Sequence, residues 1–458
     1  MTAVLRWLPG RRLAAAAEWN GRRVFLKCLF GGHRAWRQAE RELRGGRFIV
    51  AAGLRTPACV IDRVQVGGRV LGFEWLANAR PVDLEHPLEQ QAMIEALSVL
   101  DRSGYRHADP HAGNFLRVDV APKSERSDDA DSVVTFDPGP SSDRVDAQKL
   151  AAGDLVLIDA GSVRRRFWPR SFARDRARVL AQRPIAAALR SASAAEAPAI
   201  DAAEARARRQ RVRRLLRKTL RTATGFQHFE QPGVRIHVVR EPTTEGWISV
   251  VPAWLIEDPE QAMAGGVVIK AGRTATVVRI PGPPDLIIKR YNNKSAWHAL
   301  RRTLAPQSRA RSAWLNGHRL AALGIAAARP LALIETRRRG LRGPAYLIMA
   351  DAGRDDLAAC VARDQVSPAL AERVAQLLAS LAAADLAHRD LKASNVLIDE
   401  DGAPSLIDLD AMRERRGGDP RDVVRLLANW ASQPLNASIQ RLRDALVSTG
   451  LTLPAAGS

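Results

Sequence analysis

Cysteine and long apolar runs are scarce in this chain of 458 residues. The three cysteines, Cys28, Cys59 and Cys360, are scattered and lack the spacing of a zinc site. An odd, dispersed set gives no disulfide framework and predicts a reducing, cytoplasmic compartment. No stretch offers the roughly 18 uninterrupted apolar residues of a membrane-spanning helix. Residues 1–12 also lack the apolar core of a signal peptide, so the sequence predicts no membrane insertion.

Lysine is scarce too, because only 8 of the 70 basic residues are lysines. Arginine therefore supplies most of the formal net charge of +21, which predicts an anionic partner or surface. Basic residues gather within residues 206–221, beside an apolar stripe at Val212, Leu215, Leu216 and Leu220. Such a basic helix can lie on an anionic membrane surface, or it can be a solvated interdomain helix. Nucleic acid is the least favoured partner, because no helix-turn-helix, zinc-ligand or aromatic RNA-binding motif accompanies the charge.

The most informative feature that is present is the string His-Arg-Asp-Leu-Lys-Ala-Ser-Asn at residues 388–395. Thirteen residues after Asn395, a short apolar run ends at Asp408. This order and spacing are typical of the catalytic loop and magnesium-binding aspartate of protein-kinase-like phosphotransferases. Phosphoryl transfer needs an aspartate beside the attacking hydroxyl, and an asparagine and a second aspartate that hold magnesium ions at the phosphates. The whole string therefore predicts this chemistry.

The same constellation occurs earlier in the chain. Residues 107–114, His-Ala-Asp-Pro-His-Ala-Gly-Asn, again place asparagine five residues after aspartate, and a second apolar strand ends at Asp159. Here 45 residues separate Asn114 from Asp159, against 13 in the later copy. The excess falls in an insertion at residues 119–153, which is rich in polar and turn-forming residues and is predicted to be mobile. Without it the spacings agree, so the chain is interpreted as two tandem kinase-like units.

Each unit also has a lysine in a short β-rich run, Lys27 and Lys289. In a chain that uses arginine almost everywhere, a lysine at this place favours a phosphate-contacting role over a surface charge. The helix that follows should carry a glutamate that orients the lysine. Glu42 is expected to do so in the first unit, but no acidic residue occurs between Lys289 and Glu335. The second unit also has Asp410 where the usual Asp-x-Gly motif has glycine, and neither unit has a full glycine-rich phosphate loop.

Taken together, these motifs resemble those of the bacterial lipopolysaccharide-core kinase family, which phosphorylates Kdo or heptose sugars. The segments that carry the resemblance are residues 39–42, Gly53, Thr56, Pro57, 309–314, 324–325 and 329–332. The Asp-x-His-x-Gly-Asn form at residues 109–114 is similar to small-molecule and sugar kinases more than to protein kinases. The resemblance implies two tandem bilobal protein-kinase-like domains of the α+β class, with ATP and Mg²⁺ as cofactors.

The resemblance also implies roles for the residues at each centre. Asp109 and Asp390 are expected to act as general bases or as carboxylates that orient the substrate. The residues expected to bind magnesium are Asn114, Asp159, Asn395 and Asp408. The cofactor-binding set consists of Lys27, Glu42, Lys289 and Lys392.

The predicted domains are residues 1–200 and 236–458, joined by a basic helical linker at residues 201–235. The predicted function is ATP- and magnesium-dependent phosphorylation of a heptose or Kdo sugar of the lipopolysaccharide inner core. The acceptor is then a lipopolysaccharide core or a lipid-linked sugar, reached by a cytoplasmic protein held peripherally at the inner membrane. Two alternatives stay open: a protein kinase, favoured by Lys392 two residues after Asp390, and a pseudokinase scaffold, favoured by the missing helix glutamate. The sequence does not fix the oligomeric state.

Overall fold

The chain forms two compact units, Met1–Gln182 and Arg183–Ser458, here called unit one and unit two. Both combine helices with β-sheet, as the α+β class predicts, while the predicted domain boundaries at residues 200 and 236 stay predictions. The predicted insertion at residues 119–153 lies outside the described residues. The computed structural model describes residues 3–8, 11–118, 154–166, 172–193, 202–243, 246–292, 307–338, 341–353, 355–430 and 436–451.

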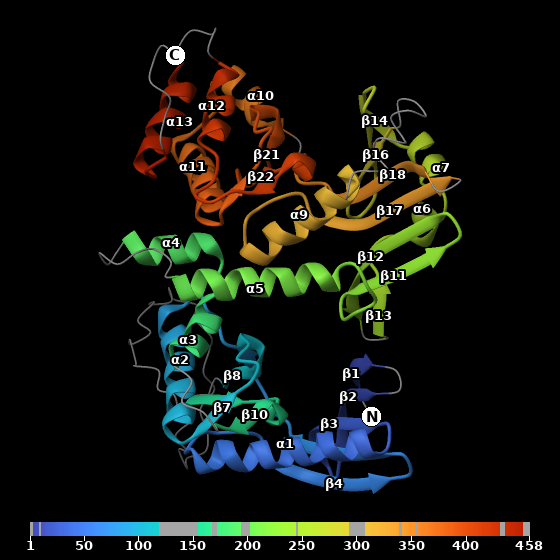
Figure 1. Cartoon of the computed structure of the whole chain (residues 1–458), viewed down its shortest axis with the longest axis vertical. Coiled ribbons are helices and arrows are strands. Elements are labelled where there is room, and N and C mark those ends of the chain that lie inside the picture. Colours follow the sequence, from blue (N-terminus) through green and yellow to red (C-terminus); the bar gives the residue numbers. More distant parts are fainter. Residues whose placement is uncertain are drawn as a thin grey trace, which may run out of the picture. The chain divides into compact units, whose positions relative to one another are not determined.

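Unit one begins with an antiparallel sheet in the order β1-β2-β3-β5-β4 (Figure 1). Asn20 and Gly21 join β2 to β3 with φ values of 49° and 72°, the backbone twist that favours a two-residue hairpin. Lys27 lies on β3, which pairs with β2 on one side and β5 on the other. The strands are β1 (Ala3–Leu8), β2 (Arg12–Trp19), β3 (Arg22–Phe30), β4 (Cys59–Gln65) and β5 (Gly68–Glu74).

Helix α1 (His33–Ala51) packs on this sheet and reaches the loop that follows β9. Its buried residues recur every three or four positions, as expected for one inward face: Ala35, Ala39, Glu42, Gly45 and Ile49. Glu42 is the charged member of that face. Gly45 lies against the backbone of Ala160, where a Cβ atom would come within 1.7 Å of the carbonyl oxygen. Only glycine therefore allows α1 to approach this loop so closely.

The rest of unit one is mostly helical and carries short strands (Figure 1). Its core includes the fully buried residues Leu100, Phe115, Leu155 and Leu157. The strands form a sheet in the order β6-β8-β9 and a separate β7–β10 pair. The elements are β6 (Ala79–Pro81), α2 (Pro87–Arg102), β7 (Tyr105–His107), β8 (Phe115–Val118), β9 (Leu155–Leu157), β10 (Val163–Arg165) and α3 (Phe172–Leu180).

Unit two contains a larger sheet in the order β11-β12-β17-β18-β16-β15-β14, with β13 paired to β12 (Figure 1). Lys289 lies on β16, again between two partner strands. The elements of this part are β11 (Phe226–Gln231), β12 (Val234–Thr243), β13 (Gly246–Ser249), α6 (Ala253–Glu257), α7 (Pro259–Ala264), β14 (Val267–Ala271), β15 (Ala275–Ile280), β16 (Leu286–Tyr291), β17 (Pro330–Arg338) and β18 (Leu341–Ala350).

Helix α9 (Arg309–Leu323) packs against β17 and β18. The Ser308 hydroxyl accepts the Arg311 N–H and so caps the start of the helix. The helix ends at Gly324, whose φ of 67° is the left-handed conformation that glycine adopts without strain. Trp314 is fully buried at its centre. Helix α9 thus holds the position in unit two that α1 holds in unit one, between a sheet and a catalytic-type loop.

The second part of unit two is helical, and its core is built around α11. The start of this helix is capped, because the Ser367 hydroxyl accepts the Leu370 N–H and Pro368 is the first helical residue. The elements are α4 (Ile185–Ser193), α5 (Ala202–Lys218), β19 (Asp355–Asp356), α10 (Leu357–Ala362), α11 (Pro368–Ala383), β20 (Leu386–Ala387), β21 (Val396–Ile398), β22 (Pro404–Leu406), β23 (Arg413–Glu414), α12 (Pro420–Ala428) and α13 (Ala437–Ser448).

Helix α5 falls in the segment predicted to be a basic linker, and it packs into unit two against α9. Val212 and Leu216 join the helical core, so much of the apolar stripe is buried in the protein and cannot also enter lipid. Arg208 is buried too, where its guanidinium group binds Glu204 at 2.6 Å and the Arg183 carbonyl. The remaining exposed arginines of α5 leave only a charged face for an external partner.

Candidate active sites

The two catalytic-type loops have the same local construction. In unit one, Asn114 ends the short 3-10 helix η1 (Ala112–Asn114), and β8 and β9 pair directly after it. The Asn114 side chain donates to the Asp109 carbonyl at 3.0 Å, and the Ile158 N–H donates to the Asn114 carbonyl at 2.9 Å. Asp159 then adopts φ 54° and begins η3 (Ala160–Ser162). These bonds bring residues that are 45 positions apart to one hairpin.

Unit two repeats these bonds residue for residue. Asn395 ends η4 (Ala393–Asn395), its side chain donates to the Asp390 carbonyl at 2.8 Å, and its carbonyl accepts the Ile407 N–H at 3.0 Å. Asp408 has φ 58° and begins η5 (Leu409–Ala411). A non-glycine residue with positive φ is uncommon and tends to occur at functional sites. Its occurrence at both aspartates supports the pairing of Asp159 with Asp408.

The predicted residues of unit one meet at a single point between the sheet and the loop. Lys27 Nζ lies 2.9 Å from Glu42 and 3.8 Å from Asp159. The same Glu42 carboxylate accepts the Gly161 N–H at 3.1 Å. Burial opposes ionisation of Asp159, yet the positive charge of Lys27 and the Ser162 hydroxyl hold its pKa below the usual range. Asp159 is therefore an anion ready to bind a cation.

A cavity of about 600 Å³ opens over this cluster. That volume lies within the range of small-molecule sites. Its lining includes residues from β2, β3 and β5 as well as the loop, and Trp75 and Leu76 just after β5. All the residues predicted for unit one line it: Lys27, Glu42, Asp109, Asn114 and Asp159. The space is therefore large enough for a small-molecule ligand beside Asp109.

Unit two brings lysine and aspartate into direct contact. Lys289 Nζ lies 2.6 Å from Asp408 Oδ1. Burial opposes ionisation of Asp408, but Lys289 and its hydrogen bond hold the pKa of Asp408 below the usual range. A cavity of about 20 Å³ adjoins the two residues and is lined by Ala313 and Tyr291. Lys392 contacts the other predicted aspartate, because its Nζ lies 3.1 Å from the half-exposed Asp390.

Ala313 occupies the helix position that Glu42 occupies in unit one. Gly45 touches the carbonyl of Ala160, and the Asn316 side chain donates to the carbonyl of Leu409 at 2.8 Å. Each of these carbonyls belongs to the residue after the aspartate that is predicted to bind magnesium. Counting three residues back along each helix gives Glu42 and Ala313. The glutamate missing from the second sequence copy is therefore replaced by a methyl group.

The negative charge has moved from the helix to the loop. A Cβ atom at Gly161 would come within 3.0 Å of the Glu42 carboxyl group, so any larger residue there would crowd Glu42. Unit two lacks the glutamate and has space for Asp410, which is buried. The Asp410 carboxylate binds Arg309 of α9 at 2.6 Å and acts electrostatically on Lys289. The departure from Asp-x-Gly is thus an exchange of charges between two elements.

Two supporting residues were not predicted from the sequence. Asp422 of α12 is buried and accepts the N–H groups of His388 and Arg389 at 2.6 and 2.8 Å. In unit one, Gln182 donates to the Pro110 carbonyl at 2.7 Å and accepts the Ala112 N–H at 3.1 Å. Each side chain fixes the backbone of one catalytic-type loop. Neither lies in a motif of its own, so only the fold reveals it.

The donor set fits a nucleotide-bound magnesium ion better than a closed metal centre. Among the described residues, no group of three or more His, Cys, Asp or Glu side chains gathers as a metal site. Magnesium at phosphotransfer sites uses one or two carboxylates and takes its other ligands from phosphates and water. Each unit offers one amide oxygen and one carboxylate for such an ion. They come from Asn114 and Asp159 in unit one, and from Asn395 and Asp408 in unit two.

Residues 270–432 match the model of a family described as the lipopolysaccharide kinase (Kdo/WaaP) family. The match lies within unit two and covers less than half of the chain. It includes Lys289, Asp390, Asn395 and Asp408, the residues that the geometry brings to one loop and one strand. No curated protein matches the chain. The matched region supports a kinase, and a lipopolysaccharide kinase in particular, and this match does not extend into unit one.

Proposed function

We propose that unit two transfers the γ-phosphoryl group of ATP, with Mg²⁺, to a heptose or Kdo hydroxyl of the lipopolysaccharide inner core. One observation carries this proposal: the family match coincides with a site where strand lysine Lys289 meets Asp408, the aspartate that follows Asn395. A lysine, an asparagine and two aspartates in this order are the parts that phosphoryl transfer requires. The family description supplies the acceptor class.

Each residue of unit two then has a definite task. Magnesium, when bound, neutralises charge that develops on the phosphates. Asn395 and Asp408 offer oxygen atoms for it, and Lys289 is close enough to exchange its carboxylate partner for a phosphate. Asp390 accepts the proton of the sugar hydroxyl. Lys392, at 3.1 Å from Asp390, is placed to contact the transferred phosphoryl group.

We extend the proposal to unit one as a second kinase-like copy. Its support is the repeated loop geometry, the Lys27–Glu42 pair and the cavity that all of its predicted residues line. Two sites in one chain suggest two acceptor hydroxyls or sugars. Asp109 would act in unit one as Asp390 does in unit two.

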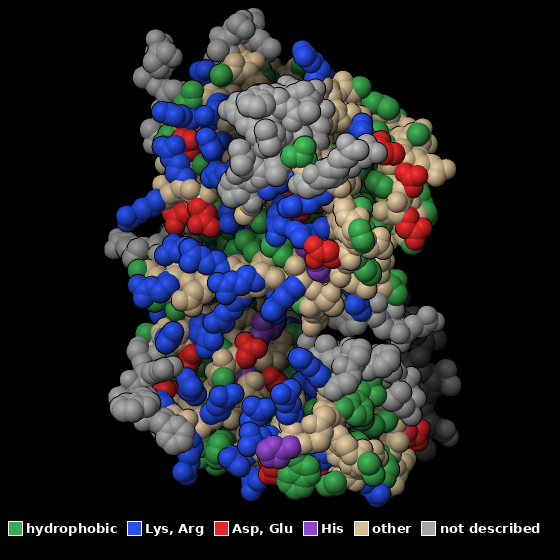
Figure 2. Space-filling view, turned by 45° about the vertical axis from the view of Figure 1, so that its right-hand side comes forward, with side chains coloured by type: hydrophobic (Ala, Val, Ile, Leu, Met, Phe, Trp, Pro, Cys, Tyr) green, Lys and Arg blue, Asp and Glu red, His purple; other side chains and the backbone are tan. Residues whose placement is uncertain are grey.

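A lipid-linked acceptor places the reaction at the cytoplasmic face of the inner membrane. No helix among the described residues is long and apolar enough to cross a membrane. Figure 2 shows lysine and arginine side chains spread widely over the face in view, with few acidic ones between them. Exposed basic residues near an anionic bilayer contribute about 1 kcal/mol each. Peripheral attachment by charge is therefore the mode that we propose.

Two other functions each have one observation in their favour. The lysine at residue 392, in contact with Asp390, is the pattern of protein kinases. The Lys289–Asp408 contact beside a cavity of about 20 Å³ favours a scaffold that no longer binds nucleotide. Direct measurement of ADP–Mg²⁺ binding separates the scaffold from both enzymes.

Mass spectrometry of core oligosaccharide tests the proposal. A deletion strain is complemented with the wild type, Asp390→Asn, Asp109→Asn or the matched control Asp401→Asn, an exposed carboxylate in the β21–β22 turn. We expect each of the first two variants to remove a distinct phosphate and the control to remove none. Unchanged core phosphate in the deletion strain itself would falsify the sugar-kinase assignment.

A further inference from the structure

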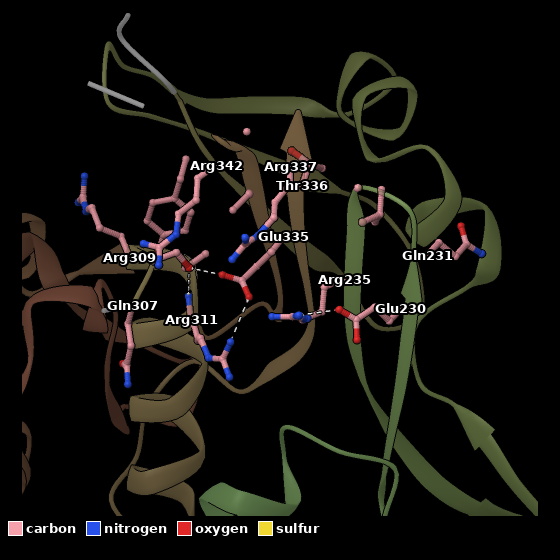
Figure 3. A pocket seen from close by; sticks show the side chains of 17 residues that line it. Glu230, Gln231, Arg235, Gln307, Arg309, Arg311, Glu335, Thr336, Arg337 and Arg342 are labelled. Carbon is pink, nitrogen blue, oxygen red and sulfur yellow. Dashed lines mark hydrogen bonds and ion pairs between the residues drawn. The ribbon is translucent and has the colours of Figure 1, made fainter. Parts of the chain in front are cut away.

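A cavity of about 200 Å³ lies in unit two beside the first turn of α9, and none of the candidate catalytic residues lines it (Figure 3). The β11–β12 hairpin, β17, β18 and α9 all contribute to its wall. Its most unusual property is its charge. Five arginines line it: Arg235, Arg309, Arg311, Arg337 and Arg342.

The carboxylates of this cavity are already engaged. Glu230 binds Arg235 at 2.6 Å. Glu335 accepts the Ser308 hydroxyl at 2.5 Å and lies 3.6 Å from Arg311, and Figure 3 shows it between helix and strand with both contacts drawn. Among the described residues, no carboxylate pairs with Arg337. Asp410, outside the wall, pairs with Arg309, so the five guanidinium groups have three carboxylates near them and the formal charge of the wall stays positive.

Two more features of the wall favour an anion. The α9 N-terminus faces this region, and a helix N-terminus attracts phosphate through its dipole. Tyr291 also lines the cavity, and its buried hydroxyl has no hydrogen-bond partner among the described residues. Arginine binds phosphate through two parallel N–H donors, which makes clustered arginines well suited to a phosphate dianion.

We propose that this cavity binds the phosphate group of a second ligand, with Arg337, Arg342 and Arg311 as its principal contacts. The proposal also gives the ligand a way to act on the candidate active site. Arg309 lines the cavity, and the same guanidinium group binds Asp410. A phosphate that draws Arg309 toward itself weakens the Arg309–Asp410 pair and changes the charge next to Lys289. Ligand binding at the arginine-lined cavity and ligand binding at the candidate active site then affect each other.

The binding step is tested with the full chain and two probes, soluble pyrophosphate and vesicles that contain phosphatidic acid. Isothermal titration calorimetry and vesicle sedimentation are run on the wild type, on Arg337→Gln/Arg342→Gln, and on Arg363→Gln as a matched control. Arg363 is an exposed arginine of unit two that pairs with Asp355. We expect the double variant to bind at least one probe about tenfold or more weakly, since it loses charged hydrogen bonds to the phosphate. The control should bind as the wild type does.

The two probes separate the possible sources of the phosphate. If the double variant loses binding of pyrophosphate only, the natural ligand is soluble. If it loses binding of the vesicles only, the ligand is a lipid headgroup. Equal binding of both probes by the wild type and the double variant overturns the proposed site. This result does not depend on phosphoryl transfer, so the site can fail while the proposed function stands, or the reverse.

Hydrogen–deuterium exchange tests the coupling. We expect the bound probe to raise exchange at the backbone amides of η5 in the wild type but not in Arg337→Gln/Arg342→Gln. Arg309→Lys keeps the charge but loses the two-point contact with Asp410, so its η5 should exchange fast with or without the probe. Exchange at η5 that is unchanged by a bound probe overturns the coupling.

Discussion

Arg309 and Asp410 form a two-point ion pair, with Nη2 and Nε of the arginine 2.6 and 2.8 Å from one carboxylate oxygen. The pair joins α9 to the loop after β22. Burial and the neighbouring Asp408 raise the pKa of Asp410, and Arg309 and Lys289 oppose that rise. In unit one the same junction has the opposite arrangement, since the helix supplies Glu42 and the loop supplies an N–H group.

The exchange of charges between helix and loop predicts that Asp410 stabilises the positive charge of Lys289, as Glu42 stabilises that of Lys27. In a chain silenced in unit one by Asp109→Asn, we expect Asp410→Asn to slow unit two about tenfold, or ~1.4 kcal/mol in the barrier. Phosphate transfer to core acceptor is the readout. Ala313→Glu combined with Asp410→Gly restores the arrangement of unit one and should recover much of the rate. An Asp410→Asn enzyme of wild-type rate contradicts the assignment.

The Lys27–Glu42 pair predicts a large cost for removing one partner. Lys27 and Glu42 are 8% and 2% exposed, so Lys27→Met leaves a buried carboxylate without its cation. Breaking a buried pair in this way costs about 3–5 kcal/mol. Pulsed hydrogen exchange of the full chain at increasing denaturant, read at the peptides of α1, measures this loss of stability.

The double variant Lys27→Met/Glu42→Gln is the control for that experiment. It removes both charges, so stability should return toward the wild type while nucleotide binding in unit one stays lost. Stability equal to that of the single variant would show that the two residues do not act as a pair.

Asp422 is predicted to hold the catalytic-type loop of unit two. Arg389 has φ 69°, an unfavourable conformation for a residue with a side chain, and its N–H donates to Asp422. Asp422→Ala leaves the buried N–H of His388 unsatisfied, at about 1–3 kcal/mol, and removes the partner of the Arg389 N–H. We expect faster exchange at residues 386–395 and a lower rate, whereas Asp444→Ala on the exposed face of α13 should change neither. Wild-type exchange in Asp422→Ala would exclude this role.

Two buried histidines predict that unit two loses stability in acid. Burial, reinforced by nearby positive charge, lowers the pKa of His237 and of His318 to about 3 in each case. The unfolded chain takes up protons near pH 6.5, where the folded one does not. Stability should therefore fall as pH falls from about 6.5 toward 3. Pulsed hydrogen exchange during thermal unfolding of the full chain, read at the peptides of α9, gives the stability of unit two at each pH. In His318→Leu this stability should fall less steeply as the pH is lowered.

Part of each site follows from sequence because it depends on neighbours along the chain. Asparagine five residues after aspartate forms the same loop bond in both units, and an apolar strand delivers Asp159 or Asp408 to its end. The helix caps are equally local, as Ser367 shows. These features need only the residue types and their spacing.

The remaining features depend on contacts between distant segments. In the sequence, Asp410 is only a departure from the Asp-x-Gly motif, and its role follows from the contact with Arg309 of α9. The role of Asp422 follows only from the packing of α12 against the catalytic-type loop. The apolar stripe of α5 is similar. Its pattern fits a membrane surface or a protein core equally well, and the packing of Val212 decides for the core.

Because Gly45 contacts Ala160 so closely, a single substitution can inactivate unit one and leave unit two intact. A single methyl group at residue 45 has no space and would wedge α1 away from the loop, carrying Glu42 out of reach of Lys27 and Gly161. Gly45→Ala thus offers an allele that disables one unit without altering any polar residue of either site. Milder versions of the same defect would appear first at high growth temperature.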